Sequence, residues 1–172
     1  QSRLMHAYES LFQKFSLNVA QILLSAADFD HERPSNHVQA TLHRLLEEKN
    51  IVPIINENDT VAVRELRVGD NDMLSAKVAR MLGARMLVML STVDGLQRDD
   101  GSVVSEVSDI DAVADHVRAD HGKFSIGGMA SKLKAVRFAL DAGVETVIAS
   151  GREPSALKSI VSGGGGGTRF IL

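Results

Sequence analysis

Cysteine occurs nowhere among the 172 residues, and its absence excludes several kinds of chemistry. Disulfide frameworks, thiolate zinc sites and cysteine nucleophiles all require this side chain. A chain without cysteine suits a reducing compartment, so a cytoplasmic location is expected. Apolar runs such as Met86–Leu90 are too short to cross a bilayer. No basic segment followed by an apolar core opens the chain, so we expect neither a signal peptide nor a membrane partner.

The chain also has no excess of basic residues. Lysine and arginine number 19 against 22 aspartates and glutamates, which gives a net charge of −3. A general nucleic-acid binder needs a basic face to displace counterions from phosphates, so nucleic acid is not expected as a partner. A local basic pocket for a small anion remains compatible with this balance. The six histidines follow no metal-binding spacing, and no metal site built from protein ligands is expected.

The sequence does contain a regular alternation of apolar patterns. Helical spacing is expected over residues 4–15, 38–46, 74–82, 109–117 and 127–142, with another helix opening at Pro154. Short apolar runs predict strands at 19–24, 51–55, 86–90, 144–149 and 169–172. The intervening segments 28–36, 56–70 and the glycine run 163–167 are expected as loops, 56–70 as a long loop or a hairpin. Continuously apolar strands that alternate with helices predict an α/β fold, a three-layer αβα sandwich with a mainly parallel sheet.

Polar clusters follow two of these strands, at the sheet edge where ligands bind in open parallel sheets. They are residues 56–59 (Asn-Glu-Asn-Asp) and 91–95 (Ser-Thr-Val-Asp-Gly). A third cluster, residues 69–72, comes directly before a helix, where Asp70 or Asp72 could simply be an N-cap. Converging carboxylates and amides suit a ligand that carries an ammonium group, or a Mg²⁺ ion.

Two glycines, Gly127 and Gly128, open the helix expected over 127–142, and Lys132 follows within its first turns. Backbone N–H groups at a helix start favour phosphate, and glycine permits close approach. The spacing is not that of a Walker A loop, and a plain helix N-terminus is the alternative interpretation.

Four segments, in this order, resemble motifs of the glutamate 5-kinases of the amino acid kinase superfamily. Residues 52–62 resemble the family's PIINENDxVA segment, and residues 68–76 resemble its GDNDxLSA segment. Residues 127–133 are similar to TGGMxTKL, and residues 149–154 are similar to ANGREP. The resemblance implies an amino acid kinase-like fold and transfer of the γ-phosphoryl group of ATP to the side-chain carboxylate of L-glutamate, the first step of proline biosynthesis.

The resemblance also assigns residues to roles. It implies that glutamate is held by Asn56, Asp59, Asp70 and Asn71. It implies that ATP is bound by Ser91, Thr92, Ile126, Gly127, Gly128, Met129, Ala130, Ser131 and Lys132, with Lys132 also catalytic. Mg²⁺ is expected with the nucleotide, and proline as an inhibitor and a homo-oligomeric state are implied as well. Two positions depart from the family pattern, since Thr92 replaces an aspartate and Ile126 a threonine.

The resemblance covers residues 1–172 as a kinase domain whose N-terminal part is missing. The family's first strand, with its lysine and Gly-Ser turn, and its C-terminal PUA domain have no counterpart in these residues. Two other interpretations stay open at this point. One is another phosphotransferase of the same superfamily, and the other is a catalytically silent fragment that binds glutamate or nucleotide.

Overall fold

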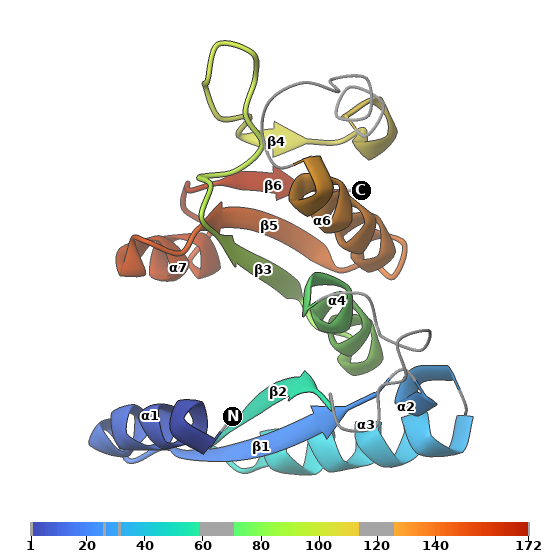
Figure 1. Cartoon of the computed structure of the whole chain (residues 1–172), viewed down its shortest axis with the longest axis vertical. Coiled ribbons are helices and arrows are strands. Elements are labelled where there is room, and N and C mark those ends of the chain that lie inside the picture. Colours follow the sequence, from blue (N-terminus) through green and yellow to red (C-terminus); the bar gives the residue numbers. More distant parts are fainter. Residues whose placement is uncertain (1, 26, 31, 59–70, 114–125, 172) are drawn as a thin grey trace. The chain divides into compact units, whose positions relative to one another are not determined.

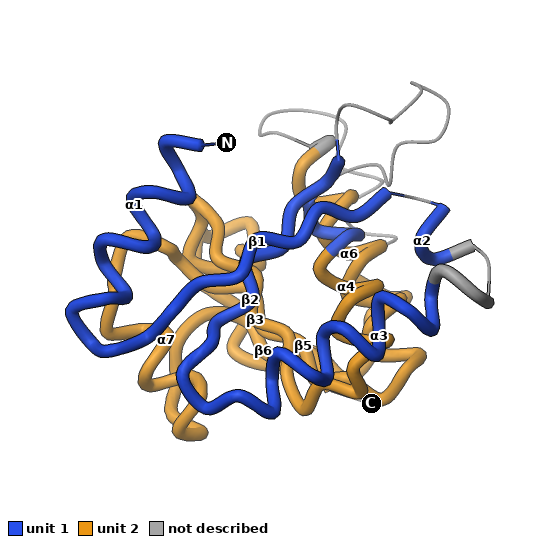
Figure 2. Tube along the Cα trace, turned by 90° about the horizontal axis from the view of Figure 1, so that it is seen from below, with its two compact units in different colours: residues 1–74 blue, residues 75–172 orange. Residues whose placement is uncertain are grey.

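The computed structural model describes residues 2–25, 27–30, 32–58, 71–113 and 126–171. Its contacts divide the chain into two compact units, residues 1–74 and 75–172 (Figure 2). The described strands form two hydrogen-bonded sheets, one of two strands and one of four. In the described part of the chain, no helix is long and apolar enough to cross a bilayer.

The first unit is built around two parallel strands. Its elements are α1 (Ser2–Phe12), the 3-10 turn η1 (Gln13–Phe15), β1 (Asn18–Leu24), α2 (Ala27–Asp30), α3 (Glu32–Glu47) and β2 (Ile51–Glu57). The register runs from Asn18 opposite Ile51 to Leu24 opposite Glu57, so both strands end at the same edge. Helix α1 packs against β1, and α3 packs against β2.

The loop expected over residues 28–36 is wrong, because this segment is almost entirely helical. Helix α2 covers Ala27–Asp30, and α3 begins at Glu32. Pro34 falls in the first turn of α3, where a backbone N–H has no intrahelical acceptor and its loss costs nothing. Proline in the first turn is therefore compatible with a helix that continues for sixteen residues.

The second unit holds a four-stranded sheet in the order β3-β5-β6-β4 (Figure 1). Its strands are β3 (Met86–Ser91), β4 (Glu106–Val107), β5 (Glu145–Ser150) and β6 (Thr168–Phe170). Its helices are α4 (Asn71–Leu82), which begins in the first unit, α6 (Ile126–Leu140) and α7 (Pro154–Val161). Three of the four strand pairings in the described chain are parallel, and only β5 with β6 is antiparallel. The predicted α/β class with mainly parallel pairing is confirmed.

Strand β5 is buried on both faces. Val147 and Ala149 pack with Ile160 of α7 in one apolar cluster. Side chains alternate along a strand, so Thr146 and Ile148 point to the opposite face, and both are fully buried there. Helix α6 also packs against β5. Helices on either side of a buried central strand are the arrangement expected of an α/β/α sandwich.

Geometry explains four of the five glycines at 163–167. Gly163 ends α7 with a φ of 82°, and Gly166 has a φ of 138°. A Cβ at Gly164 would lie 2.5 Å from the Ser159 Oγ. Gly167 has a φ of 78°, and a Cβ there would overlap the carbonyl oxygen of Ile148. Only Gly165 has open space and an ordinary φ. The predicted loop is confirmed, and its composition follows from turn geometry.

Candidate functional site

The first unit carries the glutamate-side residues that the structure describes. Asn56 is half-buried, one residue before the end of β2 and opposite Leu23 of β1. Asn71 is exposed at the first position of α4. Asp59 and Asp70 lie outside the described residues. The structure therefore places Asn56 at the predicted strand end and Asn71 at the predicted helix start, and the grouping of all four residues stays a prediction.

A polar turn closes the end of β1 beside Asn56. The Oδ2 of Asp28 accepts hydrogen bonds from the Ser25 backbone N–H at 2.6 Å and from the Ser25 hydroxyl at 2.8 Å. The Asp28 N–H in turn donates to the Ser25 carbonyl oxygen at 3.1 Å. The Asn58 N–H donates to the Leu24 carbonyl oxygen at 2.7 Å and so extends the strand pairing beyond β2. These bonds fix the backbone at the edge where Asn56 lies.

This turn is not among the elements predicted from the sequence, although its signal is present there. Ser-x-x-Asp at 25–28 has the spacing of a helix capping box, in which the fourth residue reaches back to the first. The loop expected over 28–36 begins at Asp28, so the capping signal falls across its boundary.

Replacing Asp28 with alanine should lower the free energy of unfolding of the first unit by about 1 kcal/mol, because both bonds to Ser25 are lost. Ser25→Ala removes only the hydroxyl bond and should cost less. Glu9→Ala is a matched control, since Glu9 is also acidic and is exposed on α1 of the same unit. Urea denaturation of the three variants measures the series, and an equal loss for Glu9→Ala would contradict the capping role.

The nucleotide-side residues lie in the second unit, where β3 and β5 end together. Ser91 is paired with Ser150 at the last register position of the two parallel strands. The Gly151 N–H donates to the Ser91 carbonyl oxygen at 2.8 Å, which holds the loop after β5 against the end of β3. Ser91 is half-buried and Thr92 is exposed. The sequence correctly placed both residues at the carboxyl end of a parallel strand.

Helix α6 carries the remaining predicted ATP contacts. It begins at Ile126 and includes Gly127 and Gly128 in its first turn. That first turn contains no acidic residue, and the N-terminal end of a helix carries a partial positive charge. Gly128 is exposed, and Met129, Ala130, Ser131 and Lys132 are half-buried. The predicted glycine-rich helix start is confirmed, and its role toward phosphate stays a prediction.

The connection from α6 to β5 decides which way the helix points. Gly143 has a φ of 75°, and its N–H donates to the Leu140 carbonyl oxygen at 2.7 Å. The Val144 N–H donates to the Ala139 carbonyl oxygen at 3.0 Å, so the two bonds make a Schellman motif with Gly143 at C′, as predicted. This tight turn leads at once into β5, so the helix runs back along the strand, with its N-terminus on the side where β5 ends.

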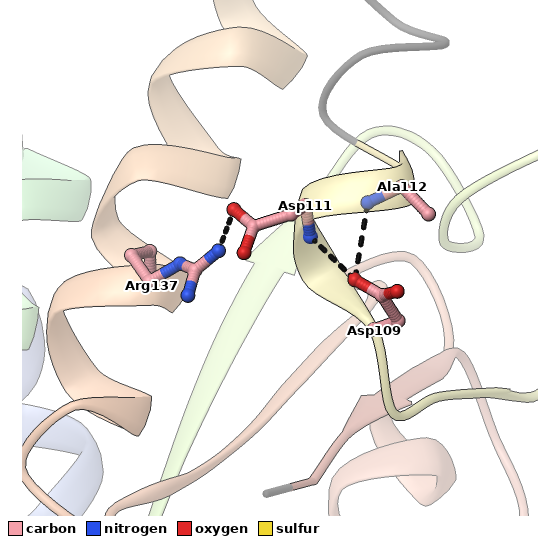
Figure 3. A network of polar contacts seen from close by, with 4 residues as sticks. All are labelled: Asp109, Asp111, Ala112 and Arg137. Carbon is pink, nitrogen blue, oxygen red and sulfur yellow. Dashed lines mark hydrogen bonds and ion pairs between the residues drawn. The ribbon is translucent and has the colours of Figure 1, made fainter.

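Two contacts hold α6 laterally. Arg137 of α6 forms an ion pair with Asp111, whose own N–H donates to the Asp109 Oδ1 at 3.0 Å (Figure 3). Asp109 thereby caps the helical residues 110–113, which follow β4. Their position agrees with the start of the helix expected over 109–117, and residues 114–117 lie outside the described part of the chain. The guanidinium of Arg80 in α4 lies 5.2 Å from the ring centroid of Phe138. Helices α4 and α6 are therefore linked by a cation–π contact.

The described residues do not offer a preformed metal cage. Within residues 2–25, 27–30, 32–58, 71–113 and 126–171, no group of three or more His, Cys, Asp or Glu side chains is placed to hold an ion. Mg²⁺ dehydrates reluctantly and is commonly held by substrate phosphates and water with one or two carboxylates. The donor set is thus compatible with Mg²⁺ that arrives on ATP.

The amino acid kinase family model matches residues 1–150. The chain belongs to the amino acid kinase family. This family uses ATP, which agrees with a phosphate-compatible helix start and a strand-end loop in the second unit.

Curated relatives of the chain are glutamate 5-kinases. The protein of Clostridium acetobutylicum is 38% identical over an alignment that covers 99% of this chain and 66% of that relative. The protein of Herpetosiphon aurantiacus is 44% identical, with 99% of this chain and 48% of the relative covered. The chain thus spans between about half and two thirds of the length of these relatives.

Solved structures support the fold. Giardia carbamate kinase matches 97% of this chain and 67% of its own, with a TM-score of 0.66 at 17% identity. An isopentenyl phosphate kinase matches 96% of this chain and 64% of its own, with a TM-score of 0.62 at 18% identity. At such identities the likeness concerns the fold alone, and it agrees with the predicted amino acid kinase-like α/β sandwich.

Proposed function

We propose that this chain is part of a glutamate 5-kinase, which transfers the γ-phosphoryl group of ATP to the side-chain carboxylate of L-glutamate. The similarity at 38–44% identity over almost the entire chain carries the proposal. In the reaction a carboxylate oxygen of glutamate attacks the γ-phosphorus, and the bond between this phosphorus and the β,γ-bridging oxygen breaks. The products are an acyl phosphate, L-glutamyl 5-phosphate, and ADP.

Each unit would supply one substrate site. On the glutamate side, Asn56, Asp59, Asp70 and Asn71 offer carboxylates and amides that suit the α-ammonium group. On the nucleotide side, Ser91 and Thr92 follow β3, and residues 126–132 open α6. Phosphoryl transfer depends mainly on positioning and on neutralising charge that is spread over several oxygens. Lys132 would provide a positive charge, and Mg²⁺ bound with ATP would provide more.

The proposal extends to residues beyond these 172. Coverage of only 48–66% of the relatives supports a longer enzyme. As the family resemblance implies, a strand outside these residues would contribute a second lysine to the phosphate site. Proline inhibition, homo-oligomeric assembly and a cytoplasmic location belong to the same proposal. Inhibition by added L-proline and sedimentation test the first two of these directly.

An acceptor profile tests the reaction. The full-length enzyme is incubated with ATP, Mg²⁺ and hydroxylamine, which traps an acyl phosphate as a hydroxamate. ADP release and hydroxamate should both depend on L-glutamate and be absent with L-aspartate, carbamate or UMP. Preference for another acceptor would assign a different reaction within the family. Binding of ATP and glutamate without ADP release would instead indicate a silent binding protein.

Glutamate-side variants test the residue roles. Asp59→Asn or Asn71→Ala in the full-length enzyme should raise the KM for glutamate by about 10- to 150-fold, since a hydrogen bond to a charged group is worth roughly 1.5–3 kcal/mol. The KM for ATP should change much less. Steady-state kinetics with each substrate varied in turn measures both constants. Equal increases for the two substrates would refute the assignment.

A further inference from the structure

Thr168 is a fully buried polar residue that neither the sequence motifs nor the proposed reaction uses. It is the first residue of β6, and its relative exposure is 0%. Its Oγ1 accepts a hydrogen bond from the Leu96 N–H at 2.8 Å, across 72 positions of sequence. Leu96 is itself buried, with a relative exposure of 7%. The bond therefore provides an acceptor for a buried backbone donor that would otherwise be costly to leave unpaired.

The same hydroxyl lies against the loop that follows β3. A Cβ on Gly95 would lie 2.6 Å from the Thr168 Oγ1 and 2.9 Å from the Val103 Cγ1. The backbone at Gly95 thus passes so close to β6 that only glycine fits. Together with the Leu96 bond, this contact fixes the far end of the loop on β6.

The near end of the loop is fixed separately. The carbonyl oxygen of Ser91 accepts the Gly151 N–H at 2.8 Å, and Ser91 is the last residue of β3. Only Thr92, Val93 and Asp94 lie between the two fixed points. Thr92 is exposed, so its hydroxyl is available while its backbone is held at both sides.

We propose that Thr168 is a positioning residue for the nucleotide, which it serves by fixing the Thr92–Gly95 loop through the Leu96 amide. The inference rests on the proposed function, because that proposal makes Ser91 and Thr92 contacts of ATP. A valine at 168 has nearly the shape of threonine but offers no acceptor, so the Leu96 amide would have to move toward water. Such a shift displaces the loop and weakens ATP binding.

A second buried threonine provides a matched control. Thr146 in β5 is also 0% exposed, and its Oγ1 donates to the carbonyl oxygen of Val144 at 3.3 Å. This bond is local and lies at the start of β5, whereas Ser91 and Ser150 lie at the opposite ends of their strands. Thr146→Val therefore makes the same chemical change in the same sheet, remote from the Thr92–Gly95 loop.

The test measures ATP binding to the full-length enzyme by titration in the presence of Mg²⁺, together with amide hydrogen exchange of Leu96. Thr168→Val should weaken ATP binding by about 10-fold, equivalent to about 1.4 kcal/mol, and should speed exchange at Leu96. Its affinity for L-glutamate should not change. Thr168→Ser retains the acceptor and should bind ATP like the wild type, and so should Thr146→Val.

The outcomes separate the inference from the proposed function. Absence of ATP binding by the wild-type full-length enzyme would overturn the assigned nucleotide site, and the inference with it. Faster Leu96 exchange in Thr168→Val with unchanged ATP affinity would overturn the inference but not the proposed function. An equal loss of ATP affinity in Thr146→Val would do the same. If Thr168→Val does not fold, Gly95→Ala is the second variant, because it displaces the same loop from the other side. It should weaken ATP binding without changing the affinity for L-glutamate. Unchanged ATP affinity in Gly95→Ala would refute the positioning role.

Discussion

Replacing Gly167 with alanine should destabilise the second unit by about 3–5 kcal/mol. Of this, roughly 1–2 kcal/mol is the cost of a left-handed backbone for an L residue, and the rest is the cost of overpacking. Gly167 has a φ of 78°, which any L side chain adopts only with strain. A Cβ there would also overlap the carbonyl oxygen of Ile148 and lie 2.8 Å from the Ala149 Cβ. Because the overlapped atom belongs to the backbone of β5, no side-chain rotation can relieve the clash.

Gly165 provides the control from the same glycine run. No heavy atom lies within 4 Å of the position that its Cβ would take, and its φ is not left-handed. Gly165→Ala should therefore alter stability by less than about 0.5 kcal/mol. Thermal melting of both variants measures the contrast, with a decrease of roughly 10–20 °C expected for Gly167→Ala. Similar melting temperatures for the two variants would show that the run is a pliable linker rather than a turn of defined geometry.

Local signals in the sequence predict much of this fold. The strands at 51–55, 86–90 and 144–149 are continuous apolar runs between helical patterns, and each corresponds to a strand of the structure within one or two residues. Gly143 marks the end of α6 because glycine at C′ accommodates a positive φ. These features depend on a few neighbouring residues, so the amino-acid sequence alone is sufficient to find them.

Pairings over long sequence separations are not visible in the same way. Strand β4 contains only Glu106 and Val107, too few to produce an alternating pattern, and it exists because Arg169 and Phe170 pair with it. The antiparallel direction of β6 is likewise set by its partner β5.

The candidate site shows the same division between local and distant signals. The resemblance to family motifs predicts Ser91, Thr92 and Lys132 as site residues, and those motifs are short local segments. Thr168 carries no local signal, since a threonine that opens a strand is unremarkable until Leu96, 72 positions away, is placed beside it. Residues that support a site from another element therefore require the structure.

Replacing Lys132 with methionine should lower kcat of the full-length enzyme by about 10²- to 10³-fold, as does removal of one preorganised donor of charge stabilisation in other enzymes. Lys132 is half-buried and occupies the seventh position of α6. Side chains of a helix lean toward its N-terminus, so a lysine at this position is within reach of the first turn of α6. Negative charge on the transferring phosphoryl group would then be stabilised by the Lys132 ammonium group and by the N-terminal end of α6.

Lys134 separates this role from the general effect of losing a positive charge. It lies two residues further along α6 and is exposed, so Lys134→Met changes the net charge equally without removing a group near the helix start. Its kcat should stay within about twofold of the wild type, since exposed charges at a distance are screened by solvent. Steady-state kinetics of glutamate-dependent ADP release compares the two variants. The KM for glutamate should change little in Lys132→Met, because the role proposed for its ammonium group is toward phosphate. A rise in this KM without a fall in kcat would move Lys132 to the glutamate site instead.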